Sequence, residues 1–142
     1  MEILCDTSFL MVLVSKPIKQ VAKIEAQLGK LDFLMPDIVE GELVRLSEKA
    51  GPKRSTLART ALGLAKTKFK TVTVKKAQHV DDSIIEYAIR RKCAVATIDT
   101  NLRRRLIANE VLVLTLSRDR LIVANPMPRQ KDQFQINFRE PV

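Results

Sequence analysis

The chain has 142 residues, of which 46% are hydrophobic, and its formal net charge is +9. This length suits one domain with a packed core, and no apolar run approaches the roughly 18 residues of a membrane span. The first residues show neither the basic nor the apolar region of a signal peptide, so we expect a cytoplasmic protein with no membrane partner. Aromatic residues make up 4% of the chain, which argues against a protein that stacks single-stranded bases on an aromatic platform.

Apolar residues recur at strand or helix spacing along the first half of the chain. Asp6 or Thr7 suits the N-cap of a helix after the first strand, Pro17 suits the first turn of the second helix, and Gly29 is a typical stop for it. The predicted elements are a strand at 2–5, helices at 7–14 and 18–28, a strand at 32–35, and helices at 37–49 and 53–68.

The second half continues this alternation and predicts one α/β domain. Its predicted elements are a strand at 69–74, a helix at 81–91, a strand at 94–98, a helix at 101–107, a strand at 111–116 and an antiparallel edge at 121–124. Alternating strands and helices with short connections indicate an α/β sandwich around a parallel sheet. We expect this domain to cover residues 1–124. An extended or flexible tail at 125–142 is expected to leave this core. Docking as an extended segment is the alternative, since Phe134, Ile136 and Phe138 alternate.

The cysteines and the histidine exclude some chemistry. Cys5 and Cys93 lie in apolar runs without a CxxC or Cys/His spacing, so we expect buried, reduced thiols. The single histidine, His79, is expected in a loop or at a helix approach. Zinc coordination and a histidine-based triad are therefore disfavoured.

The positive charge is concentrated in one segment. Residues 45–76 contain ten lysines and arginines against one acid, Glu48, so that the rest of the chain is neutral overall. Such asymmetry indicates a polyanion partner, and nucleic acid is the usual one. A solvated helical face is the alternative interpretation.

Acidic residues recur where predicted strands end and helices begin. Asp6 and Asp99 each follow a strand, Asp81 and Asp82 begin a helix, and Glu42 lies within one. Open parallel sheets bind ligands at the carboxyl ends of their strands, where the strand order reverses. If the first strand lies beside the 94–98 strand, Asp6 and Asp99 are neighbours there. Taken singly, each aspartate is also a good helix cap and Glu42 an ordinary solvated residue.

Convergence of these acids would have a chemical consequence. Clustered carboxylates repel one another unless cations neutralise them. Hard carboxylate oxygens without histidine or cysteine favour Mg²⁺ or Mn²⁺, and such ions activate water and stabilise a leaving oxygen. A basic surface around an acidic, metal-binding cleft is typical of an enzyme that hydrolyses phosphodiesters.

Four blocks of the sequence resemble a PIN domain. They cover residues 3–10 (ILCDTSFL), 35–46 (MPDIVEGELVRL), 80–106 and 111–123 (VLVLTLSRDRLIV). The third block is the most specific, with an acidic helix start, a buried strand, Thr-x-Asp and a basic helix. It is similar to the PIN proteins of small-subunit ribosomal RNA processing and their archaeal relatives, and less closely to VapC-type toxins.

The resemblance implies a three-layer α/β/α fold with strand order 3-2-1-4-5 and a divalent metal site. The site residues that it implies are Asp6, Glu42, Asp81 and Asp99. Asp82 stays an alternative to Asp81, because the doublet leaves the register open. Hydroxyls of Thr97, and of Thr7 or Ser8, are expected to support the site.

One departure concerns Asn101, which stands where many relatives have a further aspartate. An asparagine carbonyl can still ligate a metal but supplies no charge, so one-metal and two-metal versions both stay open.

The implied activity is endonucleolytic cleavage of RNA, with a ribosomal RNA precursor as the expected substrate. Asp6, Asp81 and Asp99 would hold Mg²⁺ or Mn²⁺, and Glu42 would complete the metal shell or orient the attacking water. Basic side chains are expected to bind backbone phosphates without reading sequence. They are Lys53, Arg54, Arg59, Lys66, Lys68, Arg103, Arg104 and Arg105. The last three are consecutive on a helix, so at most two of them can face the substrate.

The sequence bears on three other functions. A PIN-like scaffold that binds RNA or protein without cutting is kept open by Asn101, and a VapC-type toxin ribonuclease by the shared acids. A receiver-type phospho-acceptor needs an acid pair after the first strand, which the sequence lacks. The RNA, the cut position and the oligomeric state stay open, with a homodimer and a ribosome-assembly protein as candidate partners.

Overall fold

The computed structural model describes residues 1–16 and 18–126, in which six strands form one sheet of order β3-β2-β1-β4-β5-β6. The first five run parallel to their neighbours, and β6 is antiparallel to β5. The strands are β1 (Glu2–Cys5), β2 (Asp32–Pro36), β3 (Lys70–Val72), β4 (Ala94–Ala96), β5 (Val113–Ser117) and β6 (Arg120–Val123). The expected order 3-2-1-4-5 is confirmed, and the expected antiparallel edge extends it by one strand.

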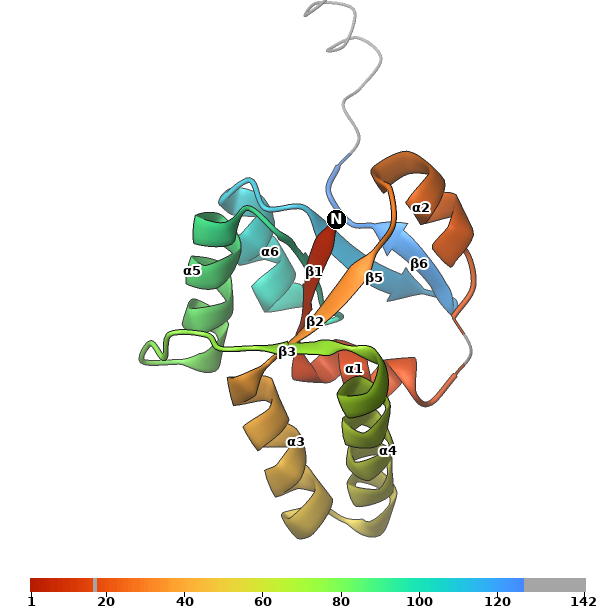
Figure 1. Cartoon of the computed structure of the whole chain (residues 1–142), viewed down its shortest axis with the longest axis vertical. Helices are drawn as coiled ribbons and strands as arrows, with labels where there is room; N and C mark the ends of the chain where they lie inside the picture. Colours follow the sequence, from red (N-terminus) through yellow and green to blue (C-terminus); the bar gives the residue numbers. More distant parts are fainter. Residues whose placement is uncertain (17, 127–142) are drawn as a thin grey trace, which may run out of the picture.

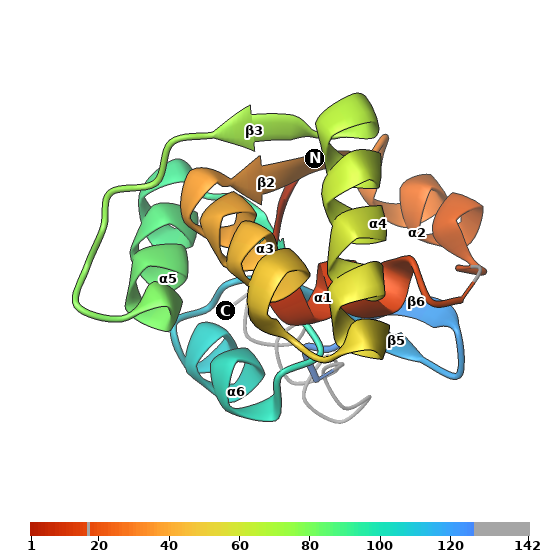
Figure 2. The same cartoon turned by 90° about the horizontal axis from the view of Figure 1, so that it is seen from below.

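Helices flank this sheet, as predicted. They are α1 (Thr7–Leu13), α2 (Val21–Leu28), α3 (Asp37–Lys49), α4 (Pro52–Lys68), α5 (Val80–Arg91) and α6 (Thr100–Ala108). Figure 1 shows α3 and α4 as an antiparallel pair beyond the carboxyl end of β1, and α5 and α6 together on one side of the sheet. In the view from below, α1 and α3 lie between the α5–α6 pair and α4 (Figure 2). The carboxyl edge of the sheet is therefore surrounded by helices.

The central strands are buried on both faces. Ile3, Leu4, Val95, Val113 and Leu114 have no exposed surface, as expected for strands of a parallel sheet covered by helices on both sides. These continuous apolar runs explain why the strands were recognisable in the sequence.

Buried alanines fix the position of α4. Ala58, Ala61 and Ala65 have no exposed surface, and their spacing places them on one face of the helix. Through this face α4 packs on α1, α3 and β3. The small side chains let the helix lie close to these neighbours.

The second helix begins later than predicted. It starts at Val21 rather than at residue 18, because the backbone of Lys19 is used by the sheet edge. The Lys19 N–H donates to the Asp119 carbonyl at 2.8 Å, and the Leu121 N–H donates to the Lys19 carbonyl at 3.0 Å. Gln20 then turns the chain into the helix with a φ of 74°. Pro17 lies outside the described residues.

The strand predicted at 94–98 is shorter than expected. β4 ends at Ala96, although the Thr97 N–H still donates to the Leu114 carbonyl at 3.0 Å. The next N–H, that of Ile98, turns to the hydroxyl of Ser8 at 3.3 Å. The chain therefore leaves the sheet beside the start of α1.

The end of the described chain is held by Asn125. Its side chain accepts from the Val113 N–H at 2.7 Å and donates to the Val111 carbonyl at 2.9 Å. The rest of the predicted tail, with the alternating Phe134, Ile136 and Phe138, lies outside the described residues.

The cysteines and the histidine lie as expected. Cys5 and Cys93 are free and buried, and burial raises the pKa of the Cys93 thiol to about 11. His79 is exposed and precedes α5. Among the described residues, no helix combines the length and the apolar character needed to cross a lipid bilayer.

Candidate active site

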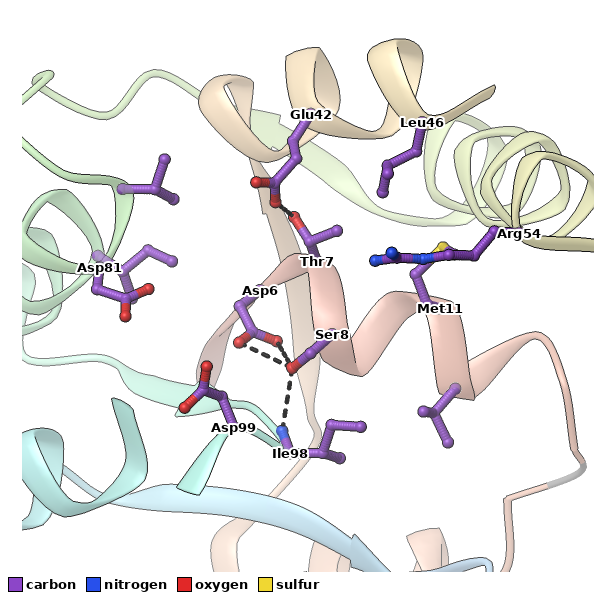
Figure 3. Close-up of a pocket in the computed structure, with 13 residues that line it drawn as sticks. Asp6, Thr7, Ser8, Met11, Glu42, Leu46, Arg54, Asp81, Ile98 and Asp99 are labelled. Atoms are coloured by element: carbon purple, nitrogen blue, oxygen red, sulfur yellow. Dashed lines mark hydrogen bonds between the residues drawn. The ribbon is translucent and has the colours of Figure 1, made fainter. Parts of the chain in front are cut away.

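Four acidic side chains line one cavity of about 460 Å³ at the carboxyl edge of the sheet. They are Asp6 after β1, Glu42 of α3, Asp81 of α5 and Asp99 before α6 (Figure 3). β1 lies beside β4, so Asp6 and Asp99 follow neighbouring strands. The structure thus brings together the four acids that the sequence singled out.

Asp6 is both a helix cap and a lining residue of this cavity. Its Oδ1 accepts from the N–H of Phe9, in α1, at 2.8 Å and from the hydroxyl of Ser8 at 2.8 Å. The side chain is 6% exposed. Burial raises the pKa of Asp6, hydrogen bonds from Thr97, Phe9 and Ser8 oppose the rise, and the charge of Asp81 adds to it. The capping interpretation is therefore correct for Asp6, and it does not exclude a second role.

Thr97 connects the two strand-end aspartates. Its hydroxyl donates to Asp6 Oδ2 at 2.5 Å and accepts from the backbone N–H of Asp99 at 3.0 Å. The residue has no exposed surface. The hydroxyl of Ser8 lies 3.4 Å from that of Thr97. The supporting hydroxyls expected from the sequence therefore lie directly behind the Asp6 carboxylate.

Asp81 and Asp99 add negative charge near Asp6, on the left of the view in Figure 3. Partial burial raises the pKa of Asp81, and the nearby charge of Asp99 raises it further, with a smaller contribution from Glu42. Asp99 accepts from the Leu102 N–H at 3.1 Å and so caps α6. The carboxylates are thus close enough to repel one another.

Glu42 is held by the start of α1. Its Oε1 accepts a hydrogen bond from the hydroxyl of Thr7, and both side chains are partly buried. Thr7 therefore supports Glu42, whereas Ser8 supports Asp6.

The two side chains of the Asp81–Asp82 doublet have different environments. Asp82 does not line the cavity; it pairs with Arg105 of α6, with 2.5 Å between Asp82 Oδ1 and Arg105 Nη2. The hydrogen bond from Arg105 lowers the pKa of Asp82. Asp81 is thus the member of the doublet that faces the other acids.

The remaining residues of the α6 start lie outside the cavity. Asn101 and Arg104 are exposed and Arg103 is half-buried, and none of the three lines the cavity. Arg105, expected to bind phosphate, is engaged with Asp82.

The basic residues of α4 divide in the same way. Among them, Arg54 lines the cavity. Arg59 donates to the Ser47 carbonyl at 3.3 Å and to the Ser55 hydroxyl at 3.0 Å, which ties α4 to α3. Lys53 and Lys66 are exposed outside the cavity. Lys68 borders a separate hollow at the other end of the sheet.

Sequence reasoning missed the apolar part of the cavity. Six apolar side chains complete its lining: Met11, Val12, Leu46, Val80, Ile84 and Ile98. A signal was present for two of them. Met11 is four residues after Thr7 and Leu46 is four residues after Glu42, and residues at this spacing share one face of a helix.

The donor set fits a hard divalent cation by its chemistry, since it consists of carboxylate and hydroxyl oxygens. The raised pKa values of Asp6 and Asp81 reflect burial and crowded negative charge, which a cation would relieve. In the described part of the chain, however, no three acidic, histidine or cysteine side chains stand close enough together to form a ready-made metal site. Hydrogen bonds from Thr97, Ser8 and Thr7 hold two of the acids in their present positions.

Comparison with known proteins identifies the family. Residues 3–120 match the family model of a PIN like domain, and no curated protein sequence matches the chain. The solved structure of the PIN domain endonuclease Utp24 shares 25% identity with a TM-score of 0.70, over 89% of this chain and 92% of that one.

Two more distant structures share the fold alone. The structure of VapBC2 from Rickettsia felis was solved bound to a DNA fragment from the VapBC2 promoter. It is 13% identical with a TM-score of 0.61, over 82% of this chain and 100% of that one. A domain of a functionally unknown protein from Methanocaldococcus jannaschii is 15% identical with a TM-score of 0.53, over 82% and 91%. The resemblance seen in the sequence is therefore confirmed: the chain belongs to the PIN-like domain family, whose members are typically nucleases.

Proposed function

We propose that the protein is a metal-dependent endoribonuclease whose active site is the acidic cavity. The observation that carries this proposal is the convergence of four carboxylates from four separate elements on one cavity, where burial and mutual repulsion raise the pKa of Asp81. A fold gains nothing in stability from such crowding, whereas a phosphodiester hydrolase needs it to bind cations.

Asp6, Asp81 and Asp99 would hold the cation, for which Mg²⁺ or Mn²⁺ is the choice that their hard oxygens favour. PIN-domain nucleases generally use divalent metal ions. When bound, the ion supplies an activated water and neutralises charge on the phosphate. Asp6 must release part of its hydrogen bonding to take part, because Ser8 and Thr97 engage both of its oxygens.

Two groups of this chain would position the reactants. The Thr7 hydroxyl bonds to Glu42 and so fixes the carboxylate that we assign to orienting the attacking water. Thr97 fixes the distance between the Asp6 carboxylate and the start of α6. Water attacks phosphorus, which leaves a 5′-phosphate and a 3′-hydroxyl.

RNA is the proposed substrate because of the charge and the relatives. The net charge of +9 favours a polyanion. The sequence resembles PIN proteins of ribosomal RNA processing and shares 25% identity with the endonuclease Utp24. We therefore propose a cytoplasmic role on a ribosomal RNA precursor rather than that of a VapC-type toxin, since the VapBC2 likeness extends to the fold alone.

A second candidate is a PIN-like scaffold that binds RNA without cutting it. It is favoured by the finding that the described acidic side chains do not form a ready-made metal site. Asn101, which kept this alternative open in the sequence, is exposed outside the cavity.

One assay separates the two candidates. Wild type, Asp81→Asn, Asp99→Asn and Asp82→Asn are incubated with structured and single-stranded RNA in Mn²⁺ or EDTA. Asp82→Asn is the matched control, since it removes the same charge next to Asp81 but outside the cavity. The enzyme predicts cleavage by wild type and Asp82→Asn in Mn²⁺ alone, and none by the other two. Binding without cutting by all four proteins would support the scaffold.

A further inference from the structure

The acidic cavity contains one basic side chain from the described residues, that of Arg54. Arg54 lies in the first turn of α4 (Pro52–Lys68), and Figure 3 shows its guanidinium on the side of the cavity away from Asp81 and Asp99. The ion pairs among the described residues are Lys16–Asp119 and Arg105–Asp82. Arg54 takes part in neither.

Other basic side chains nearby are either engaged or outside. Arg59, later on the same helix, is hydrogen-bonded to Ser47 and Ser55 and joins two helices. Lys53, next to Arg54, is exposed and does not line the cavity. Arg54 is thus the cationic group of α4 that faces the cavity without a partner among the described residues.

Two apolar side chains, Met11 and Leu46, form an apolar wall on the side of the cavity from which Arg54 enters (Figure 3). Met11 follows Thr7 by one helical turn on α1, and Leu46 follows Glu42 by one turn on α3. One turn advances about 5.4 Å along the helix axis, a separation comparable with that of neighbouring phosphates along a nucleic acid strand. One side of the cavity is therefore anionic, with Asp81 and Asp99, and the other side combines apolar side chains with the cationic Arg54 (Figure 3).

We propose that Arg54, Met11 and Leu46 form a subsite for the nucleotide that flanks the cleaved bond, with Arg54 binding the phosphate of that nucleotide. This inference rests on the proposed endoribonuclease function. A guanidinium presents a planar pair of donors that matches two phosphate oxygens. The apolar wall suits the sugar and the face of a base without selecting among bases.

The subsite also answers an electrostatic difficulty. Four carboxylates in one cavity repel the phosphates of a substrate strand, and a bound cation neutralises them only near the cleaved bond. The Arg54 guanidinium, next to the apolar wall, holds the adjacent phosphate, which fixes the register of the strand. Positions further along the strand are left to nonspecific contacts with the basic surface.

The test neutralises single phosphates. RNA oligonucleotides that wild type cuts at one position are made with one methylphosphonate at each linkage in turn, and kcat/KM is measured in Mn²⁺ for wild type, Arg54→Ala, Arg54→Lys and Lys53→Ala. Because a hydrogen bond to a charged group contributes about 1.5–3 kcal/mol, one linkage next to the cut is expected to lower kcat/KM of wild type about 10- to 100-fold.

Arg54→Ala should have a similarly lowered kcat/KM on unmodified RNA, and that one methylphosphonate should not lower its kcat/KM further. Arg54→Lys should recover part of the sensitivity. Lys53→Ala is the charge-matched control. It should lower kcat/KM by the same factor for all substrates and keep the full sensitivity to the one methylphosphonate. Circular dichroism melting of each variant checks that it is folded.

Undiminished sensitivity of Arg54→Ala to every methylphosphonate overturns the subsite, as does a wild type that is insensitive at all linkages beside the cut. If wild type cuts no RNA, the proposed function fails, and a short RNA that wild type binds is made with one methylphosphonate at each linkage in turn and used in fluorescence anisotropy. One linkage whose neutralisation weakens binding in wild type but not in Arg54→Ala would then sustain the subsite without the nuclease. Equal weakening in both proteins would end it.

Discussion

Thr97 donates its hydroxyl to Oδ2 of Asp6 at 2.5 Å, across 91 positions of sequence. The same hydroxyl accepts from the backbone N–H of Asp99. One buried oxygen therefore joins the residues that follow β1 and β4, and it does so at the level where the sheet ends. The two strands bring Asp6 and Asp99 to one edge of the sheet. Thr97 then fixes the Asp6 carboxylate relative to the backbone of Asp99.

Removing this hydroxyl should affect both stability and the site. Thr97→Val keeps the side-chain volume but removes one of the three donors to Asp6 and leaves the Asp99 N–H without its acceptor. A buried group left without a partner costs about 1–3 kcal/mol, so we expect the free energy of unfolding to fall by about 2 kcal/mol, together with a loss of cleavage. Urea denaturation and the RNA assay measure the two effects.

Thr97→Ser is the control for this variant, because it retains the hydroxyl and removes a methyl group. It should keep most of the activity even where packing lowers the stability. Equal activity of Thr97→Val and wild type would show that the hydroxyl is not needed.

The two capping aspartates should differ in their contribution to stability. Asp6 is buried and accepts from Phe9, Ser8 and Thr97, whereas Asp99 is exposed and caps α6 through one hydrogen bond. Loss of an N-cap costs about 1 kcal/mol, so Asp99→Ala should lose roughly that amount. Asp6→Ala should lose roughly twice as much, since it also removes the acceptor of the buried Thr97 hydroxyl and of the partly buried Ser8 hydroxyl.

The midpoints of urea denaturation, compared between the two variants and wild type at an unchanged m-value, measure these losses of stability. Both variants are expected to be inactive. If Asp99→Ala proved as unstable as Asp6→Ala, then Asp99 would be a structural residue and its loss of activity would say little about catalysis.

The doublet in α5 makes a prediction about pH. The pKa of Asp81 is raised by partial burial and by Asp99, and the pKa of Asp82 is lowered by Arg105. A carboxyl with a raised folded-state pKa disfavours the folded state once the pH exceeds that pKa, and the penalty vanishes below the unfolded-state value. Asp82 has the opposite sign: it stabilises the fold at neutral pH, and this contribution is lost as the pH falls through its lowered pKa.

Metal-free Asp81→Asn should therefore melt at a higher temperature than wild type at pH 7, with the difference disappearing as the pH falls into the range of an unperturbed carboxyl group. The gain should stay near 0.5 kcal/mol, because Asp81 is partly exposed and solvent screens its repulsion. Asp82→Asn should melt below wild type at pH 7. Thermal melting in EDTA from pH 3.5 to 8 follows both differences. If both variants melted above wild type at pH 7, or both below it, then Asp81 and Asp82 would not have the opposite environments described above.

How much of this site the sequence predicted can be followed residue by residue. Asp6 and Asp99 were predictable, because each follows an apolar run that reads as a buried parallel strand. The strand order came from the resemblance to the family, and the structure confirms it. The register of the doublet was not predictable, since a one-residue rotation on α5 exchanges Asp81 for Asp82, and Arg105 from another helix decides between them.

Contacts between distant elements also account for what was missed. The start of α2 depends on Lys19 joining the edge of β6, a pairing with residues about a hundred positions later. Arg54 was one of eight basic residues expected to bind RNA, and nothing local distinguishes it from Lys53. It is the packing of buried alanines of α4 on α1 and α3 that directs Arg54 into the cavity.

Divalent cations should stabilise the protein through the same acids. A ligand that binds the folded state alone adds RT ln(1 + [L]/Kd) to the free energy of unfolding, about 2.7 kcal/mol at a hundredfold excess over Kd. Mn²⁺ or Mg²⁺ should therefore raise the melting temperature of wild type and of Asp82→Asn, and EDTA should reverse the rise. Asp81→Asn should show little or no rise, although it is the more stable protein without metal. Asp81→Asn would thus melt above Asp82→Asn without metal but gain less from it, which is the mark of cation binding in the cavity. General screening of surface charge would instead shift the melting temperatures of all three proteins together. Na⁺ at matched ionic strength measures that screening separately.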